Sequence, residues 1–291
     1  MQRVEAIASR TQQELEARLA QIGLLSRVFG RAKTSQSMQE KLGRHPGKYV
    51  PGGKLIQDAV GVRVMLYFND DVELAKTVLL GRFELVELVE DAPDASEFGP
   101  KRLNMVFRLS EQEGLELRNY YGSECVDSTF EVQVRTILSE GWHEVEHDLR
   151  YKHQDDWAKS PDLSRTLNGI LATLETCDWT MLKLFEEKAL EHYRSHEWLA
   201  MLRSKLRLRM TDDPISPDLE SLLEADGHLA NELFHFDRRQ LVLAIARAGM
   251  NLPMTADNVL HLANHFVIKD PELAARMPRT LAAVLAERMS T

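Results

Sequence analysis

Apolar and polar residues alternate strictly in residues 130–136, near the middle of the chain. Two valines face one way, whereas Glu131, Gln133 and Arg135 face the other. A period of two residues predicts a β-strand, here with one apolar face and one charged face. Charged and amide groups are costly to cover unless a ligand pairs with them. The pattern therefore favours the floor of a site for a ligand with phosphates and a metal, although a half-exposed edge strand would show the same alternation.

Other segments with clear periodicity predict both helices and strands. Residues 1–28 have helical spacing, with Ile7, Leu15, Leu19, Ile22 and Leu25 on one face. A loop is expected to enter an apolar strand within residues 56–68. The further elements are helices at 72–80 and 164–196, a helix ending near 152, strands at 83–89, 104–109 and 129–136, a polar loop at 91–99 and an irregular insert at 110–128. Together they predict a mixed sheet with flanking helices.

The last hundred residues have no strand pattern. Pro214 and Pro217 interrupt the chain, and short helices are expected at 218–234, 238–249, 255–266, 271–276 and 279–289. We therefore predict two domains, residues 1–195 and an all-α extension at 196–291 whose role the sequence does not indicate. A basic stretch at its start (Arg203, Lys205, Arg207 and Arg209) could contact RNA, a partner or the first domain, although a solvated surface explains it as well.

A basic segment lies upstream of the first predicted strand. Between Arg27 and Lys54 there are seven lysines and arginines and one acidic residue. Lys33, Ser37 and Lys41 have the spacing of successive helical turns, so we expect them on one helix face. A local excess of positive charge in an acidic protein indicates an anion site, whereas a solvated basic loop and helix is the alternative.

Four motifs follow one another in order. They are Arg31-x-Lys33-x-x-x-Ser37-x-x-x-Lys41, Asp58-x-x-Gly61-x-Arg63, Glu131-x-Gln133-x-Arg135-Thr136, and Glu146-His147 followed by Tyr151-Lys152. In this combination they resemble the synthetase domain of the RelA/SpoT family, and the layout is most similar to the small alarmone synthetases. The resemblance implies an α+β, nucleotidyltransferase-like fold. It also implies Mg²⁺-dependent transfer of pyrophosphate from ATP to a ribose 3′-hydroxyl, an activity of the GTP pyrophosphokinase type.

The resemblance assigns roles by motif position. Transfer of this kind consists mainly of positioning and charge stabilisation. Asp58 resembles a Mg²⁺ ligand, and Glu131 resembles a second ligand or the general base. Arg31 and Arg63 resemble the residues on either side of adenine. Lys33, Ser37 and Lys41 resemble the residues that contact the ATP phosphates. The remaining matches resemble supporting or phosphate-contacting residues: Gln133, Arg135, His147 and Lys152.

The acceptor part of the chain departs from the family pattern. A Gly-Tyr-x-Ser-x-His element, whose tyrosine stacks on the acceptor guanine, is expected before the Glu-x-Gln-x-Arg strand. Here Pro100 replaces the tyrosine and Asn104 the histidine, with Lys101 and Arg102 between them. We therefore expect an acceptor loop (Lys101, Arg102, Asn104) that takes an acceptor other than GDP or GTP. The alternatives are a toxic relative that pyrophosphorylates a tRNA 3′ end, and a catalytically weak module that binds a nucleotide or a partner.

Composition and charge limit the partners and the cellular compartment that the sequence predicts. The chain has 291 residues, 44% of them hydrophobic, and a formal net charge of −9, which disfavours broad nucleic-acid binding. Cys125 and Cys177 have no metal or disulfide spacing, which favours a reducing compartment. No segment has the length of a membrane span or the pattern of a signal peptide. We expect a cytoplasmic enzyme that binds ATP and an acceptor nucleotide, makes no membrane contact, and uses its helical extension for any homo-oligomer or protein partner.

A competing motif overlaps the last of the four. His143-Glu144-Val145-Glu146-His147 matches the His-Glu-x-x-His signature, whose two histidines share a helix face and can bind Zn²⁺. The neighbouring Glu-x-Gln-x-Arg strand favours the synthetase interpretation over the zinc interpretation.

Overall fold

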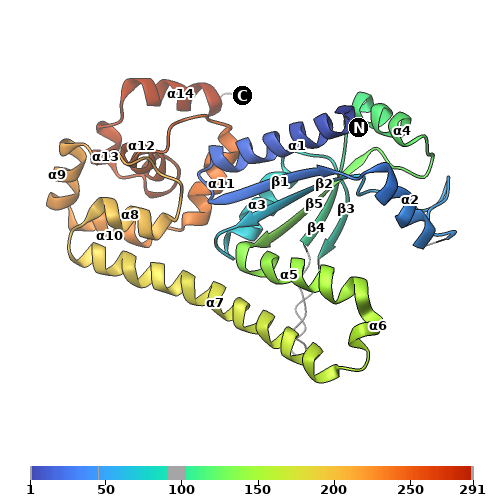
Figure 1. Cartoon of the computed structure of the whole chain (residues 1–291). Helices are drawn as coiled ribbons and strands as arrows, with labels where there is room; N and C mark the ends of the chain where they lie inside the picture. Colours follow the sequence, from blue (N-terminus) through green and yellow to red (C-terminus); the bar gives the residue numbers. More distant parts are fainter. Residues whose placement is uncertain (1, 45, 91–102, 290–291) are drawn as a thin grey trace. The chain divides into compact units, whose positions relative to one another are not determined.

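The computed structural model describes residues 2–44, 46–90 and 103–289 (Figure 1). The chain divides into two compact units, Met1–Ala17 with Ser26–Asp178, and Arg18–Leu25 with Trp179–Thr291. The first unit contains a five-stranded mixed sheet with flanking helices, and the second is built of helices. The predicted α+β class with a helical C-terminal part is confirmed. The predicted domain boundary at residue 195 stays a prediction.

The sheet of the first unit has the strand order β1-β2-β5-β4-β3. Its edges are β1 (Ser26–Ala32) and β3 (Leu85–Glu90). The two strands that the sequence marks most clearly, β2 (Val60–Leu66) and β5 (Thr129–Thr136), are neighbours and run parallel. The other pairs, including β4 (Leu103–Arg108) with β5, are antiparallel. This topology brings together two motifs that are far apart in the sequence.

One face of the sheet is apolar and the other is polar. The apolar face includes the buried side chains of Val60, Val62, Val64, Val132 and Val134. Helix α1 (Gln2–Gln21) crosses this face at Gly30, where a Cβ would lie 2.7 Å from the Ala8 carbonyl oxygen, so the close approach requires glycine. Helix α5 (Ile137–Leu149) lies on the opposite, polar face (Figure 1).

The first helix is shorter than predicted. It ends at Gln21, and Gly23 follows in a left-handed conformation with φ of +75°. The Leu24 amide then donates to the Leu19 carbonyl oxygen, an arrangement that terminates helices. The prediction of a helix through residue 28 is therefore wrong. Residues from Ser26 onward form the edge strand β1, which the hydrophobic pattern did not predict.

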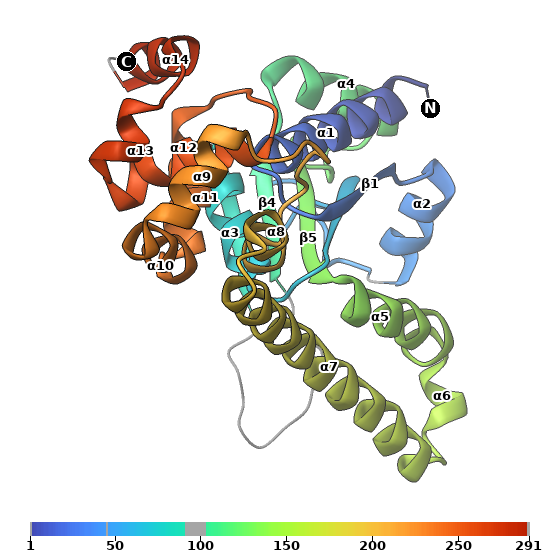
Figure 2. The ribbon, with the colours of Figure 1, turned by 90° about the vertical axis from the view of Figure 1, so that its left-hand side faces the viewer.

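The segment expected to be an irregular insert contains a helix. Helix α4 (Glu111–Tyr121) begins with a capping box between Ser110 and Glu113 and ends at Gly122, which has φ of +55°. The Ser-x-x-Glu spacing is a helix-start signal, so the prediction for residues 110–128 was wrong despite a local cue. Helix α4 lies beside α1 (Figure 2), and Arg10 of α1 is 3.3 Å from the Glu113 carboxylate.

The first unit contains further helices, some of which the sequence predicted. They are α2 (Ser35–Arg44), α3 (Asp71–Leu80), a 3₁₀ turn (Tyr151–His153), α6 (Gln154–Trp157) and the long α7 (Pro161–Arg194), whose last residues belong to the second unit. The predicted helices at 72–80 and 164–196 are confirmed with ends that differ by a few residues.

The second unit packs short helices around a leucine-rich core. Its helices are α8 (Trp198–Leu206), α9 (Pro217–Ala225), α10 (Gly227–His235), α11 (Arg238–Ala248), α12 (Ala256–Ala263), a π turn (Asn264–Ile268), α13 (Pro271–Ala275) and α14 (Arg279–Met289). The segment 218–234 divides because Asp226 caps α10 with its side chain. Among the described residues, no helix has the length and apolarity that crossing a membrane requires.

The basic stretch at residues 203–209 contributes to the interior of the second unit. The Arg203 guanidinium donates to the Thr211 carbonyl oxygen at 3.1 Å, and Lys205 donates to the Phe234 carbonyl oxygen at 2.5 Å. Burial lowers the pKa of Lys205 to about 8. Arg207 is buried as well. The interpretation of this stretch as a solvated surface is therefore wrong for Lys205 and Arg207, whereas the Arg203 side chain remains 40% exposed.

Candidate active site

The polar face of the sheet carries the predicted site residues in two rows. In the first row, Arg31 of β1, Gly61 of β2 and Glu131 of β5 are direct cross-strand neighbours. In the second row, Arg63 of β2 pairs with Gln133 of β5, which pairs with Asn104 of β4. Directly opposite residues project to the same side of a sheet. The predicted alternation of residues 130–136 is confirmed, and three separate motifs share one surface.

Asp58 is held by two lysines immediately before β2. The Lys33 ammonium lies 2.8 Å from Asp58 Oδ2, and the Lys41 ammonium lies 2.7 Å from both Oδ1 and Oδ2. Burial raises the pKa of the Asp58 carboxyl, but the charges and hydrogen bonds of the two lysines outweigh burial and hold that pKa below its ordinary value of 3.8. Asp58 therefore stays ionised, with both oxygens occupied by ammonium groups.

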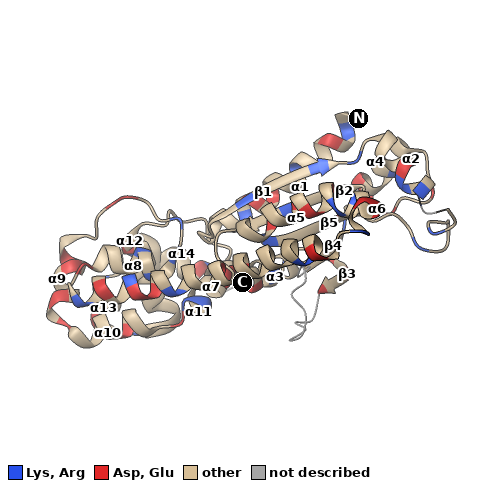
Figure 3. Cartoon of the chain, turned by 60° about the horizontal axis from the view of Figure 1, so that its bottom comes forward, with Lys and Arg blue, Asp and Glu red and all other residues tan. Residues whose placement is uncertain are grey.

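The two lysines reach Asp58 from different elements. Lys41 belongs to α2, but Lys33 lies in the connection between β1 and α2, so the prediction that Lys33, Ser37 and Lys41 share a helix face is wrong. Ser37 is exposed, and its hydroxyl accepts a hydrogen bond from Thr34 at 3.0 Å. Helical spacing was the wrong template because Arg31 and Ala32 still belong to β1. Figure 3 shows positive charge on β1, on α2 and in the segment that follows.

Glu131 is a half-buried acid between two amides. The side-chain amide of Asn104 donates to Glu131 Oε1 at 3.1 Å, and that of Gln133 donates to Oε2 at 3.0 Å. Burial, followed by the negative charge of Asp58, raises the pKa of Glu131 above its ordinary value of 4.5, whereas the Gln133 hydrogen bond acts in the opposite direction. Asp58 and Glu131 thus interact, although their carboxyl pKa values move in opposite directions. We call Lys33, Lys41, Asp58 and Glu131 the donor cluster.

Gly61 leaves part of the sheet surface bare between Arg31 and Glu131. A Cβ built on Gly61 would meet no atom within 4 Å. Gly61 has no positive φ angle, so its backbone does not require glycine. The open space lies on the polar face, beside the donor cluster.

A second set of charges lies on the same face under α5. Arg63 pairs with Glu140 at 3.1 Å and also with Glu144, and Arg135 pairs with Glu140 at 2.9 Å. We call Arg63, Arg135, Glu140 and Glu144 the arginine cluster. It joins β2 and β5 to α5, so Arg63 and Arg135 already have protein partners.

Two predicted supporting residues lie on the surface of the α5 region. His147 and Lys152 both contact the Asp148 carboxylate, at 2.9 Å and 2.7 Å, and the His147 ring stacks on Tyr151. His143 of the zinc-type signature is buried, whereas His147 is exposed. No group of three or more potential His, Cys, Asp or Glu ligands occurs in the described part of the chain, so the geometry gives the zinc interpretation no support.

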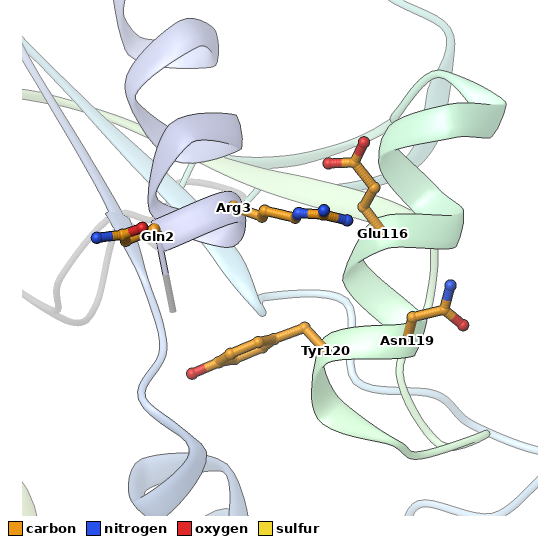
Figure 4. Close-up of a pocket in the computed structure, with 5 residues that line it drawn as sticks. All are labelled: Gln2, Arg3, Glu116, Asn119 and Tyr120. Carbon is orange, nitrogen blue, oxygen red and sulfur yellow. The ribbon is translucent and has the colours of Figure 1, made fainter.

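The predicted acceptor loop is only partly described. Asn104 lies on β4 and contacts Glu131, whereas Lys101 and Arg102 lie outside the described residues, as does Pro100. A separate pocket of about 560 Å³ lies between α1 and α4, lined by Gln2, Arg3, Glu116, Asn119 and Tyr120 (Figure 4). In Figure 4 the Arg3 side chain points toward Glu116. None of the predicted site residues lines this pocket.

Comparison with known proteins identifies the region around this site. Residues 30–156 match the family model described as "Region found in RelA / SpoT proteins". The GTP pyrophosphokinase YjbM of Bacillus subtilis (strain 168) is 30% identical over 130 residues, which are 43% of this chain and 56% of that protein. The chain therefore spans little more than half the length of this relative. The match confirms the predicted resemblance of residues 30–156 to the RelA/SpoT family.

A solved structure agrees at the level of the fold. A GTP pyrophosphokinase family protein from Streptococcus pneumoniae superposes with a TM-score of 0.50 and 21% identity, covering 61% of this chain and 87% of that one. The small alarmone synthetase 1 from Bacillus subtilis gives a TM-score of 0.49 and 21% identity, with coverage of 62% and 92%. The first similarity supports a shared fold, which by itself does not define the reaction.

Proposed function

We propose that this protein transfers the β,γ-pyrophosphate of ATP to a ribose 3′-hydroxyl. The observation that carries the proposal is the donor cluster, in which two interacting acids and two lysines meet within a region that matches the RelA/SpoT family. Lysine ammonium groups suit phosphates, and paired acids suit a metal and a general base. The named activity of the relative YjbM supports the same class of reaction.

In this reaction the acceptor 3′-oxygen forms a bond to the β-phosphorus of ATP. The bond between that phosphorus and the oxygen that bridges to the α-phosphate breaks, and AMP leaves. The proton of the 3′-hydroxyl goes to Glu131, whose raised pKa suits a general base. Arg31 and Arg63 would flank adenine, because planar guanidinium groups stack on rings, and we expect ATP to bind more tightly than GTP.

The residues present fit a magnesium ion. Mg²⁺ prefers carboxylate oxygens and is commonly held by one or two carboxylates together with substrate phosphates, so Asp58 would suffice as its ligand, with Glu131 as either a second ligand or the general base. Bound there, the ion would neutralise charge that develops on the transferred pyrophosphate. In the protein alone, the Asp58 oxygens are occupied by Lys33 and Lys41. We therefore expect the lysines to move to the ATP phosphates when Asp58 takes the metal.

The acceptor is proposed to differ from GDP and GTP. Asn104 replaces the histidine of the family pattern and binds the Glu131 carboxylate, next to the expected position of the attacking hydroxyl. The replacement of the family tyrosine by Pro100 removes an aromatic partner for guanine, a contact worth about 1–3 kcal/mol per base where it has been measured. Another nucleotide or an RNA 3′ end would then compete successfully as acceptor.

Incubation with γ-labelled ATP tests the function directly. The assay supplies GDP, GTP, other nucleotides and tRNA as separate acceptors, with the Glu131→Gln variant as control. The proposal expects labelled pyrophosphate on at least one acceptor and release of AMP, both absent from the control. Efficient labelling of GDP or GTP would contradict the proposal of an altered acceptor and would indicate a standard alarmone synthetase. ATP binding without transfer to any acceptor would instead favour a nucleotide-binding module.

A further inference from the structure

The last turn of α4 contacts the segment that carries Lys33. The hydroxyl of Tyr121 donates a hydrogen bond of 2.5 Å to the Lys33 carbonyl oxygen. The neighbouring Tyr120 accepts a hydrogen bond of 3.2 Å from the hydroxyl of Ser35, the first residue of α2. The Lys33 amide donates to the Ala59 carbonyl oxygen at 2.9 Å. The backbone of Lys33 is therefore held on one side by the residue after Asp58 and on the other by α4.

The chain that follows α4 also holds the residues immediately before Asp58. Three hydrogen bonds make this connection: the Ile56 amide to the Cys125 carbonyl oxygen at 2.7 Å, the Asp127 amide to the Ile56 carbonyl oxygen at 2.9 Å, and the Thr129 hydroxyl to the Gln57 carbonyl oxygen at 3.1 Å. Residues 121–129 thus fasten the backbone beside both partners of the Lys33–Asp58 ion pair.

We propose that Tyr121 is a positioning residue of the transfer reaction, because its hydroxyl fixes the Lys33 backbone so that the Lys33 ammonium reaches Asp58 and then the ATP phosphates. The proposal rests on the function proposed above. It assigns a role to a residue that none of the four sequence motifs includes. Tyr121 does not touch the reacting atoms, and it acts only through Lys33.

The environment of Tyr121 keeps its hydroxyl protonated, so that it can donate a hydrogen bond. Burial, with smaller contributions from Tyr120 and Asp58, raises the pKa of Tyr121 to about 12. The phenol is therefore protonated at neutral pH, where its hydroxyl can donate the hydrogen bond to Lys33. Tyr121 is also only partly exposed, which limits competition by water.

The test compares Tyr121→Phe with the matched control Tyr120→Phe. Each change removes one hydroxyl from the same helical turn, but only Tyr121 contacts Lys33. Binding of a non-hydrolysable ATP analogue is measured by calorimetry, and KM is measured for ATP and for the acceptor. Tyr121→Phe should raise the KM for ATP and weaken binding of the analogue by about tenfold, which is at the upper end of the effect of one hydrogen bond. The KM for the acceptor should stay unchanged. Tyr120→Phe should change these values by about twofold or less.

A double-mutant cycle separates positioning from general stability. In a Lys33→Met background, Tyr121→Phe should cause no further loss of analogue binding, because the group it positions is absent. An additional loss of the full size in that background overturns the proposal, and so does unchanged ATP binding in Tyr121→Phe alone. If the wild-type protein binds the analogue but transfers no label, the proposed function fails while the binding cycle still decides the role of Tyr121. If the wild-type protein binds no analogue, both proposals are overturned.

Discussion

The donor cluster and the arginine cluster each contain two positive and two negative side chains on the same face of one sheet, but their charges are balanced differently. In the arginine cluster, each arginine has a glutamate partner from α5, and the Glu140 and Arg135 side chains are only 6% and 12% exposed. In the donor cluster, both lysines bind Asp58, and Glu131 is left with two neutral amides.

Apart from the contact with adenine proposed for Arg63, this difference distinguishes a set of charges that joins strands to a helix from a reactive one. Pairing that joins strands to a helix keeps an arrangement fixed, and removing one buried partner is costly. In the donor cluster, the pKa of Asp58 is lowered and that of Glu131 is raised. Two acids whose pKa values are pushed apart can divide the work, because one remains charged while the other accepts a proton.

The largest expected effect separates the two clusters by neutralising one acid in each. Asp58→Asn should lower the transfer rate by about 1,000-fold or more, since the change removes the proposed metal ligand, which would stabilise transition-state charge. Glu144→Gln, the matched change in the arginine cluster, should alter the rate by about fivefold or less, because Glu144 is half-exposed and Arg63 keeps Glu140. Single-turnover transfer assays and thermal unfolding of both variants provide the measurement. Equal losses of rate in the two variants would falsify the distinction.

A smaller effect is expected from filling the bare surface at Gly61. Gly61→Val should weaken ATP-analogue binding by about tenfold or more, because the added side chain occupies the space between Arg31 and Glu131. The melting temperature should stay the same or rise, since valine suits a strand better than glycine and a Cβ there meets no atom within 4 Å. Calorimetric titration and thermal unfolding give the two readouts. Gly141→Ala on α5 is the control, and unchanged binding in Gly61→Val would show that the donor does not use this surface.

The smallest effect concerns pH. Glu131 must be ionised to act as a base, so kcat/KM should rise with pH through the Glu131 pKa, which lies above 4.5. The pKa of Asp58 lies below 3.8, so Asp58 stays ionised over this pH range. Gln133→Leu removes a hydrogen bond that lowers the Glu131 pKa, so the acid limb of the pH profile should move to higher pH. For stability the sign for Asp58 is opposite: its lowered folded pKa contributes stability above pH 3.8 that is lost as the pH falls through that folded pKa. An acid limb that does not move in Gln133→Leu would exclude Glu131 as the titrating base.

The sequence predicted the parts of the fold that depend on local periodicity. The strand at 129–136 and the long helix at 164–196 are recovered because one residue pattern extends over their full length. The edge strand β1 was missed because residues 1–28 have helical spacing, and the helix is ended by Gly23 rather than by a change in hydrophobicity. Helix α4 was missed because its hydrophobic face is short and gives little periodicity. Its start is marked instead by the capping box, which is independent of hydrophobicity.

The candidate site was predicted in its residue types but only partly in its contacts. Asp58, Glu131, Lys33 and Lys41 follow from motif positions, and the structure brings them together. The partners of Arg63 and Arg135 could not be predicted, because Glu140 and Glu144 meet them only after α5 folds back onto the sheet. The contact of Tyr121 with Lys33 could not be predicted for a similar reason: it depends on tertiary packing, and no spacing rule links the two positions.

The parallel pairing of β2 with β5 has a consequence for synthesis on the ribosome. β1 can pair with β2 as soon as both have emerged, but β5 is the last strand in the sequence and enters between β2 and β4. Pairing of distant segments is slow and closes large loops, so completion of the sheet is expected to be a late folding event. Until then, a growing chain carries Lys33, Lys41 and Asp58 but has no Glu131 beside them. Under the proposed function, a chain that ends before β5 would hold phosphates without the acid proposed to accept the proton, and would therefore transfer nothing.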